Sequence, residues 1–216
     1  GSSPPSRTIR IMKTLRIDQN RPNRLGIESI LECLHAGGVV AAPTETVFGL
    51  MTAWDNQEGR RRIYSMKGRS FDKPLQMLAA NLDMTVRHGV QPDARAEKLA
   101  AQFWPGPLTA VLPARDGQTI GLRIPDHPLI MQILKELKQP LAATSANKSG
   151  SPPATHAAQI PTNLHHPPDL LIAGLDAGGG TASAVIMLRK DDWQLLREGP
   201  ISEHELEETL GPASNA

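Results

Sequence analysis

Apolar residues recur every three or four positions through several stretches of the chain, and shorter apolar runs lie between those stretches. The helical spacing predicts helices over residues 24–36, 60–66, 92–103, 129–137 and 202–211. The shorter runs predict strands over residues 39–42, 73–78, 108–112, 121–124, 141–144, 170–173, 183–188 and 193–196. Helices and strands alternate over the first two-thirds of the chain, so we predict an α/β fold.

Residues that start or stop helices support these bounds. Gly37-Gly38 follows the first predicted helix, and Ser202 and Glu205 have capping-box spacing before the last one. Trp104-Pro105-Gly106-Pro107 ends the helix over 92–103, and its main predicted role is a rigid turn that packs the indole. Residues 149–168 are rich in Pro, Thr and His and are predicted to form a surface segment.

The length of 216 residues fits one domain, predicted over 9–211, with unstructured tails at 1–8 and 212–216. No apolar run approaches the roughly 18 residues that span a bilayer. The first residues also lack the apolar centre of a signal peptide. The single Cys33 cannot form an internal disulfide and fits a reducing compartment. We therefore expect a cytoplasmic protein without membrane association.

The charge of the chain restricts the classes of partner. A formal net charge of +1 lacks the excess of basic residues typical of nucleic-acid or membrane-surface binders. Aromatic residues make up 3% of the chain, so platforms on which single-stranded bases stack are scarce. Any site for an anion must therefore be local.

One such local cluster is Lys67-Gly68-Arg69, followed closely by Lys73. Arginine offers a planar fork to phosphate oxygens, lysine a compact charge, and glycine allows close approach of the backbone, so the cluster suits a polyphosphate. Basic clusters are, however, more often solvated surface, and on its own this one is better explained in that way.

Two polar loops follow predicted strands, where ligands of α/β sheets bind. The loop 144–150 is rich in hydroxyl and amide groups, and an ordinary turn or helix cap explains it equally well. In the loop 43–46 the hydroxyls suit the polar groups of an amino acid, and Glu45 suits an ammonium group or a metal. The start of a capped helix explains the loop 43–46 almost as well.

Two arginines lie in or beside predicted strands. Arg123 must be paired if it is buried, and an anionic ligand is one possible partner. Arg197 closes the last strand, where a surface ion pair is the default interpretation. The histidines show no metal-binding spacing, and Gly178-Gly179-Gly180 is too compressed for a dinucleotide fingerprint, so neither a structural metal nor a glycine-rich phosphate loop is predicted.

Separately these signals are weak, but their order and spacing over about residues 24–200 resemble the YrdC-like family of L-threonylcarbamoyladenylate synthases. The matching motifs are Pro43-Thr44-Glu45-Thr46-Val47-Phe48-Gly49-Leu50, Lys67-Gly68-Arg69 with Lys73-Pro74-Leu75, Trp104-Pro105-Gly106-Pro107-Leu108-Thr109, Arg123-Ile124-Pro125-Asp126-His127-Pro128, Ser145-Ala146-Asn147 with Ser149-Gly150, and Leu196-Arg197-Glu198-Gly199. Six motifs in the same order make a chance similarity very improbable.

The resemblance implies a twisted, largely mixed sheet with flanking helices around a wide basic cavity. It also implies that ATP, L-threonine and bicarbonate yield threonylcarbamoyl-AMP and pyrophosphate, with Mg²⁺ as the expected cofactor. The product passes to downstream tRNA-modification proteins that make t6A in tRNA. No nucleophilic side chain is needed, because positioning and charge limit such a step.

The resemblance also implies roles for individual residues. Lys67 and Arg69 are the expected catalytic residues, since their charges stabilise the phosphates in the transition state. The expected contacts of L-threonine are Thr46, Arg123 and Ser183. The expected contacts of ATP are Arg69, Lys73, Thr119, Ser145, Asn147 and Arg197.

Three features depart from the family pattern. Phe48 stands where Tyr is common, and Ser183-Ala184-Val185-Ile186-Met187 stands where Ser-Thr-Val-Val-Asp is usual. Strand alternation predicts that Ala184 points away from the ligand that Ser183 contacts. We also expect the chain to end soon after the core fold, without the further C-terminal domain of some relatives.

Two rival functions stay open. A basic concave surface also suits an RNA backbone, so the chain can be an RNA-binding ribosome-maturation protein, or a synthase with weak binding to tRNA. Near-neutral charge and scarce aromatic residues count against this alternative. A carbamoyl-adenylate enzyme of the same fold that uses another acceptor is the second rival.

Overall fold

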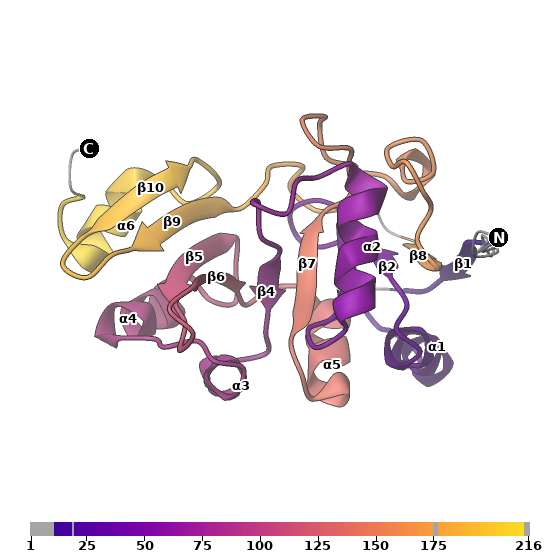
Figure 1. The fold of residues 1–216 in the computed structure, drawn as a ribbon, viewed down its shortest axis with the longest axis horizontal. Coiled ribbons are helices and arrows are strands. Elements are labelled where there is room, and N and C mark those ends of the chain that lie inside the picture. Colours follow the sequence, from indigo (N-terminus) through magenta and orange to yellow (C-terminus); the bar gives the residue numbers. More distant parts are fainter. Residues whose placement is uncertain (1–10, 19, 175–176, 214–216) are drawn as a thin grey trace, which may run out of the picture.

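The computed structural model describes residues 11–18, 20–174 and 177–213. The predicted tail 1–8 and the end of the predicted tail 212–216 lie outside these residues. The described chain forms one ten-stranded mixed sheet in the order β1-β8-β2-β3-β7-β4-β6-β5-β9-β10, with helices packed against it (Figure 1). The prediction of an α/β fold with a mixed sheet is confirmed.

The helices and strands have the following bounds. The strands are β1 Lys13–Arg16, β2 Val40–Ala42, β3 Gly49–Ala53, β4 Gln76–Leu78, β5 Leu108–Pro113, β6 Thr119–Arg123, β7 Leu141–Ser145, β8 Leu170–Ala173, β9 Ala184–Leu188 and β10 Trp193–Arg197. The helices are α1 Arg24–His35, α2 Gln57–Lys67, α3 Leu82–Arg87, α4 Ala94–Phe103, α5 Pro128–Leu137 and α6 Glu203–Leu210, with a 3-10 turn η1 at Ala157–Gln159.

Every helix and strand predicted from the pattern is present, but β1, β3, α3 and η1 were not predicted. All five residues of β3 are buried, so the alternation that reveals a half-exposed strand is missing. β3 pairs antiparallel with β2, which makes the loop 43–46 a connection between two strands. The alternative interpretation of that loop as the start of a capped helix is therefore wrong.

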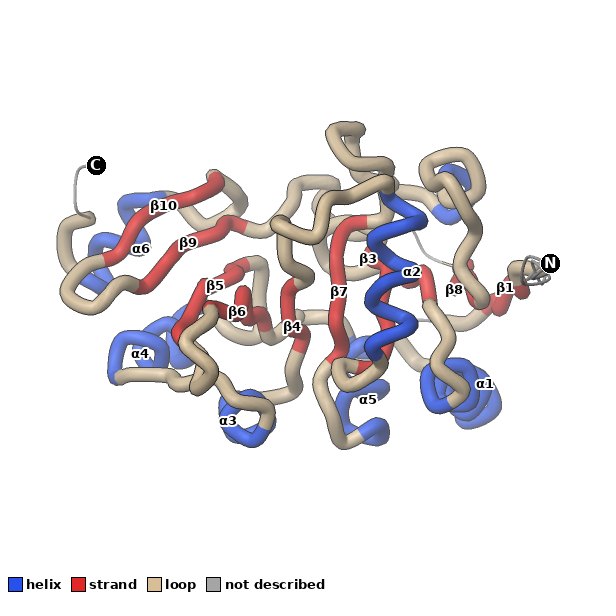
Figure 2. Tube along the Cα trace, viewed as in Figure 1, coloured by secondary structure: helices blue, strands red, loops and turns tan. Residues whose placement is uncertain are grey.

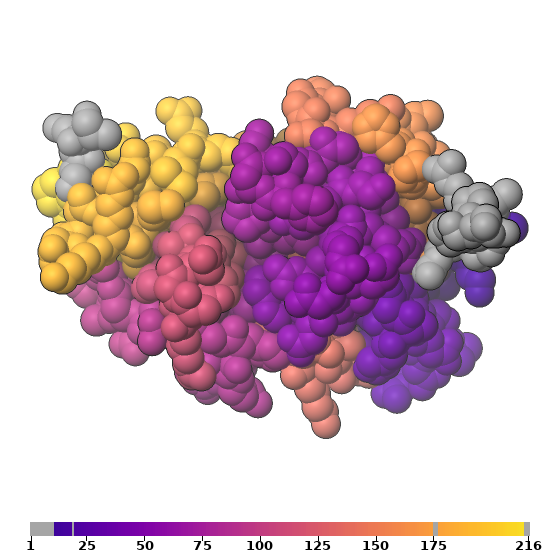
Figure 3. Space-filling view, in the orientation of Figure 1, coloured from indigo at the N-terminus to yellow at the C-terminus, as the bar shows by residue number. Residues whose placement is uncertain are grey.

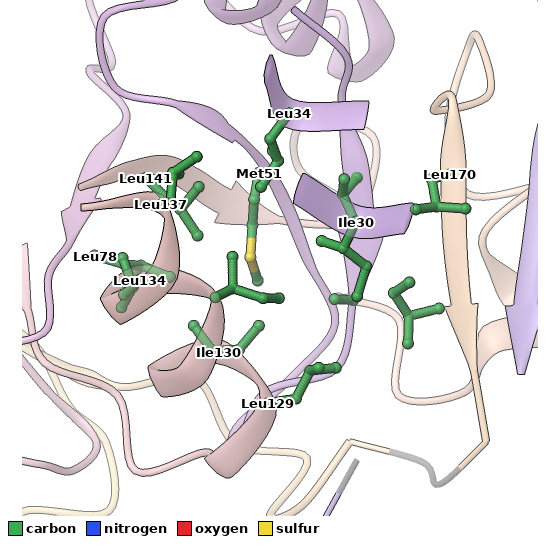
Figure 4. Close-up of a cluster of buried hydrophobic side chains, with 14 of the residues drawn as sticks. Ile30, Leu34, Met51, Leu78, Leu129, Ile130, Leu134, Leu137, Leu141 and Leu170 are labelled. Carbon is green, nitrogen blue, oxygen red and sulfur yellow. The ribbon is translucent and has the colours of Figure 1, made fainter. Parts of the chain in front are cut away.

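One half of the sheet is covered on both faces. Side chains of β2, β3 and β7 alternate between the two sides: Val40 and Met51 pack with α1 and α5, whereas Ala41 and Leu50 pack with α2. Figure 4 shows the first of these cores, with Met51 among the leucines and isoleucines of α1, α5 and the strands. This half is a packed scaffold with little room for a ligand.

The segment 149–168, predicted at the surface, is anchored to the α2 side of that scaffold. Ala154, Ile160 and Leu164 are buried in the core there. The backbone N–H of Phe48 donates to the carbonyl of Ala154 at 2.9 Å. The segment therefore holds the connection between β2 and β3 from outside, and its apolar residues belong to the core.

The other half of the sheet, β4, β6, β5 and β9, is covered by α3, α4 and α6 on one face. Leu108, Ala110, Leu122, Ala184 and Ile186 point into this core together with side chains of α4 and α6. Figure 2 shows α3 and α4 below β5 and β6, and α6 beside β9 and β10. Alternation sends the remaining strand residues to the opposite face, where they line a cavity.

The position of α2 links the two halves. In the space-filling view of Figure 3, α2 and the residues that follow it occupy the middle of the face, between the C-terminal strands and the N-terminal helix. Asn56 caps the start of α2 by accepting from the N–H of Gly59, and Gly68 ends it with φ of 59°.

No helix in the described part of the chain is long and apolar enough to cross a membrane.

Candidate active site

The open face of β4, β5, β6 and β9 forms the floor of a cavity of about 250 Å³. Its floor residues share one face of the strands: Gln76, Thr109, Val111, Thr119, Gly121 and Val185. Its walls come from connecting segments and strand ends, and include Thr46, Val47, Arg69, Pro74, Ser145, Ala182, Ser183 and Arg197. Segments from all parts of the chain therefore meet at one enclosure.

The C-terminus of α2 places Lys67 behind this cavity. The Lys67 side chain is buried, and its Nζ donates to the carbonyl oxygens of Ser145 and Asn147 at 2.5 and 2.7 Å and to Asn147 Oδ1 at 3.2 Å. Burial, with the positive charge of Arg69, lowers the pKa of Lys67 to about 7. Lys67 is not among the cavity-lining residues. Its role is to hold the loop after β7 in place, because its hydrogen bonds go to Ser145 and Asn147.

Arg69 follows the left-handed Gly68 and reaches the cavity. Its Nε donates to the carbonyl of Lys73 at 2.8 Å and its Nη2 to the carbonyl of Pro74 at 3.2 Å. These bonds fix the guanidinium against the loop before β4, and burial lowers the pKa of Arg69. Lys73 contributes its carbonyl to this arrangement, and its side chain is not among the cavity-lining groups.

The loop between β2 and β3 is fixed from two sides. Thr44 Oγ1 lies 2.9 Å from Thr46 Oγ1 and donates to the carbonyl of Val47 at 2.8 Å. The backbone N–H groups of Gly178, Gly179 and Gly180 donate to the carbonyls of Thr44, Glu45 and Thr46 at 3.1, 2.8 and 2.9 Å.

The segment 178–180 carries glycines because its backbone lies very close to the loop 43–46. A Cβ on Gly178 would lie 2.5 Å from the carbonyl oxygen of Glu45, which is too close for any other residue to fit without a shift. The glycine run therefore holds Thr46 at the cavity wall, a role that its sequence pattern did not reveal.

Arg123 is buried at the end of β6 and has several partners. Its Nη2 pairs with Glu45 Oε1 at 2.5 Å, its Nη1 donates to Thr46 Oγ1 at 3.1 Å, and its Nε donates to the carbonyl of Gly106 at 3.3 Å. The expectation that a buried Arg123 is paired is confirmed. Glu45 thus forms an ion pair with a guanidinium, and its Oε1 accepts a hydrogen bond from the N–H of Asp126 at 3.0 Å.

The Pro-rich turn that supplies Gly106 matches its predicted role. Trp104 is buried, and its indole N–H donates to the carbonyl of Leu108 at 2.7 Å. The peptide bond between Trp104 and Pro105 is cis. The backbone of Gly106 donates to the carbonyl of Ile124 at 2.9 Å and accepts from Arg123, so the turn sets the direction of that arginine.

Arg197 of β10 turns inward to Ser183. Its Nε and Nη2 donate to the carbonyl of Ser183 at 3.0 and 2.7 Å, and Nη2 also lies 3.2 Å from Ser183 Oγ. Burial, with the charge of Arg123, lowers the pKa of Arg197. The interpretation of Arg197 as a surface ion pair is wrong, because its partner is the backbone of a cavity-lining residue.

Seven of the residues singled out from the sequence line this one cavity: Thr46, Arg69, Thr119, Arg123, Ser145, Ser183 and Arg197. Lys67, Lys73 and Asn147 lie outside its lining. The roles assigned to all ten residues stay predictions. The floor residues Gln76 and Thr109 were missed, because a single polar residue in a short apolar strand carries no signal until the open face of the sheet is known.

The charges of the site suit an anionic ligand. The charged side chains among the described residues that line the cavity are three arginines, at 69, 123 and 197. Hydroxyls of Thr46, Ser145 and Ser183 lie beside them. In the described ranges there is no group of three or more His, Cys, Asp and Glu side chains placed to hold a metal ion. The arrangement can bind phosphate or carboxylate groups through directed hydrogen bonds.

Several known proteins are similar to this chain in sequence. A threonylcarbamoyl-AMP synthase of Bacillus subtilis is 36% identical over 93% of this chain and 62% of its own length. One of Vibrio parahaemolyticus is 31% identical over 80% of this chain and 98% of its own length. The chain spans 62% and 55% of the lengths of the synthases of Bacillus subtilis and Pyrococcus abyssi.

Solved structures show the same architecture. Pyrococcus abyssi Sua5 complexed with L-threonine superposes with a TM-score of 0.84 and 31% identity, over 94% of this chain and 62% of that one. Escherichia coli YciO, 23% identical, shares the fold with a TM-score of 0.82 over 91% of this chain and 100% of its own.

The family model that matches carries the names Sua5, YciO and YrdC and the description "Telomere recombination". The match extends over residues 32–199, which include every lining residue of the cavity. The chain therefore belongs to the Sua5–YciO–YrdC family.

Proposed function

We propose that the chain is a threonylcarbamoyl-AMP synthase, which converts L-threonine, bicarbonate and ATP into threonylcarbamoyl-AMP and pyrophosphate. One observation carries the proposal: three arginines with fixed orientations and several hydroxyls surround a single cavity in a chain whose relatives bear that name. A relative, Sua5 of Pyrococcus abyssi, forms a complex with L-threonine, which supports this amino acid as a ligand of the fold.

The cavity offers separate places for the two larger substrates. Arg123, whose charge Glu45 balances, and Thr46 form a polar corner that we assign to the carboxylate of L-threonine, with Ser183 on the adjoining wall. Arg69, Ser145 and Thr119 line the part that we assign to ATP, with Lys73 and Asn147 at its border. Arg197 lies between the two parts, because it contacts Ser183 and also faces the cavity.

The chemistry needs positioning and charge stabilisation from these residues. The amino nitrogen of L-threonine, after loss of its proton to solvent, attacks the carbon of bicarbonate, from which water then leaves, or the carbon of carbon dioxide, and a carbamate forms. A carbamate oxygen then attacks the α-phosphorus of ATP, and the bond to pyrophosphate breaks. Arg69 and Arg197 stabilise the negative charge that spreads over the phosphate oxygens. Lys67 acts indirectly, since its hydrogen bonds fix the end of β7 at Ser145 and the loop at Asn147.

Other participants follow from this reaction. Mg²⁺ neutralises phosphate charge in such transfers, and here it enters bound to the triphosphate. Threonylcarbamoyl-AMP is a reactive mixed anhydride, so downstream tRNA-modification proteins take it up to form t6A. We assign the reaction to the cytoplasm, where ATP and tRNA are both present.

Release of pyrophosphate tests the proposal directly. The protein is incubated with ATP and Mg²⁺, and pyrophosphate is measured with L-threonine and bicarbonate together, with each alone and with neither. We expect rapid release only with both, because the carbamate is the nucleophile. Equal release without L-threonine contradicts the proposal, and a protein that only binds the RNA backbone releases none under any condition.

A further inference from the structure

A chain of hydrogen bonds crosses the floor of the cavity. Arg197 Nη2 lies 3.2 Å from Ser183 Oγ, Ser183 Oγ lies 2.8 Å from Thr109 Oγ1, and Thr109 Oγ1 donates to Gln76 Oε1 at 3.1 Å. The four side chains come from β10, the residue that precedes β9, β5 and β4, and all line the cavity. Strands that are far apart in sequence thus share one polar row.

The hydrogen bonds of this row all run in one direction, with each group donating to the next from Arg197 to Gln76. A guanidinium can only donate, so Ser183 Oγ accepts from Arg197. The hydroxyl proton of Thr109 goes to Gln76 Oε1, so Thr109 accepts the proton of Ser183. This order leaves the amide N–H groups of Gln76 Nε2 without a hydrogen bond to the described part of the chain, and leaves one lone pair on Ser183 Oγ. A donor and an acceptor therefore face the cavity on either side of Thr109.

Apolar groups adjoin this polar row. Val111 follows Thr109 on the same face of β5, and Val185 of β9 pairs with Thr109 in register. Gly121 lies next to both Thr109 and Gln76 and places no side chain there. The part of the floor around Thr109 therefore combines the amide donor of Gln76, the acceptor Ser183 Oγ and the methyl groups of Val111 and Val185. A side chain with one hydroxyl and one methyl group matches it.

We propose that Gln76 is a specificity-determining residue, whose Nε2 donates to the side-chain hydroxyl of a β-hydroxy amino acid while that hydroxyl donates to Ser183 Oγ. The proposal rests on the proposed function, which places an amino acid in this part of the cavity. Arg123 and Thr46 take the carboxylate, so the neutral amide of Gln76 is left for a neutral group.

The proposal predicts selection against an isostere. L-Valine has the shape of L-threonine without the hydroxyl, and it would leave both the amide of Gln76 and the lone pair of Ser183 unpaired. Sites that bind a substrate hydroxyl in this way reject analogues that lack it strongly. L-Serine keeps the hydroxyl and loses only the methyl contact with the valines, so it should be rejected less strongly than L-valine.

Equilibrium binding measures this selection without catalysis. Isothermal titration calorimetry gives the Kd of L-threonine and L-valine, in the presence of the α,β-methylene analogue of ATP, which cannot release pyrophosphate. We expect Gln76→Met to lower the preference for L-threonine about tenfold, which is roughly 1.4 kcal/mol. The Kd of the ATP analogue should stay within about twofold. Gln132→Met on α5 is the matched control, because Gln132 bonds Glu136 and lies outside the cavity lining.

A second variant separates direct contact from mere support of Thr109. Gln76→Glu keeps an oxygen that accepts from Thr109 but has no N–H to donate, so we expect it to lose the preference as Gln76→Met does. Full preference in Gln76→Glu overturns the proposal, since an N–H donor at this position would then not be needed. If Gln76→Met fails to fold by circular dichroism, Thr109→Val breaks the same row, and an unchanged preference in that variant overturns the proposal equally.

Binding and pyrophosphate release, measured together on wild type and the Gln76 variants, distinguish a failure of this proposal from a failure of the proposed function. Preferential binding of L-threonine that Gln76→Met abolishes, without any release of pyrophosphate, supports the role of Gln76 and contradicts the synthase activity. Release of pyrophosphate that needs L-threonine, with the preference unchanged in both Gln76 variants, supports the activity and overturns the role of Gln76. Wild-type protein that does not bind L-threonine overturns both.

Discussion

The buried Lys67 offers a test of how the site is held together. Lys67→Met replaces the ammonium by a neutral side chain of similar length. Burial and the nearby charge of Arg69 favour the neutral amine and lower the pKa of Lys67 to about 7, from 10.5 in the unfolded chain. The three oxygen acceptors around Nζ favour the ammonium and oppose this shift.

The sign of the effect follows from proton binding. Between pH 7 and 10.5 the unfolded chain keeps the proton on Lys67 while the folded chain has released it. The unfolded state thus binds more protons, and the free energy of unfolding rises with pH through this interval. The stabilisation is complete above the unfolded pKa and is lost as the pH falls toward 7. From pH 7 to pH 9 this one group contributes about 2 kcal/mol.

Urea unfolding measures this contribution. The free energy of unfolding is determined for wild type and Lys67→Met at pH 7, 8 and 9, and the difference between the two proteins is compared across pH. Other titrating groups cancel in that difference, so it should change by about 2 kcal/mol in favour of wild type as the pH rises. A difference that stays constant refutes the reasoning, because the three acceptors would then hold the proton on Lys67.

The remaining predictions concern the cavity. Arg69→Ala should lower turnover roughly 10²-fold, the loss expected for one charge-stabilising contact. Activity within threefold of wild type would show that Arg69 has no catalytic role and belongs to a solvated basic cluster. Ser183→Ala should raise the KM for L-threonine about tenfold, whereas Ala184→Thr should change it less than about threefold and instead lower the melting temperature, because Ala184 is fully buried. Gly178→Ala should raise the KM for L-threonine while leaving the KM for ATP nearly unchanged, since its Cβ would displace the backbone of Glu45; equal changes in both constants would contradict this.

Periodic patterns predicted most of the helices and strands, and the exceptions have physical reasons. α3 is one short helix of six residues, too brief for its apolar positions to repeat. β1 has a pattern of mostly exposed residues at the edge of the sheet, where it pairs only with β8. β3 is buried along its whole length. Each lacks the contrast between apolar and polar positions on which such prediction depends.

The site divides in a similar way. Arg69 and Ser145 lie in polar motifs after a helix and at the end of a strand, and the resemblance of these motifs to the YrdC-like family gave both as expected ATP contacts before the fold was known. Gln76 and Thr109 lie inside strands, where a polar residue can equally point to solvent. Their significance depends on which face α3, α4 and α6 cover, and that choice is made by packing between segments distant in sequence.

The departures from the family pattern at residues 184 and 187 do not alter the cavity. Ala184 is fully buried on the core side of β9, its N–H donates to the carbonyl of Pro107 at 3.0 Å, and a Cβ on Gly199 would lie 2.6 Å from its Cα. A methyl group fits this crowded apolar position and leaves no hydroxyl to pair. Met187 shares the open face of β9 with Val185 but is not among the residues that line the cavity. The predicted orientation of Ala184 is thus confirmed, and the contacts of Ser183 with Arg197 and Thr109 form without help from either position.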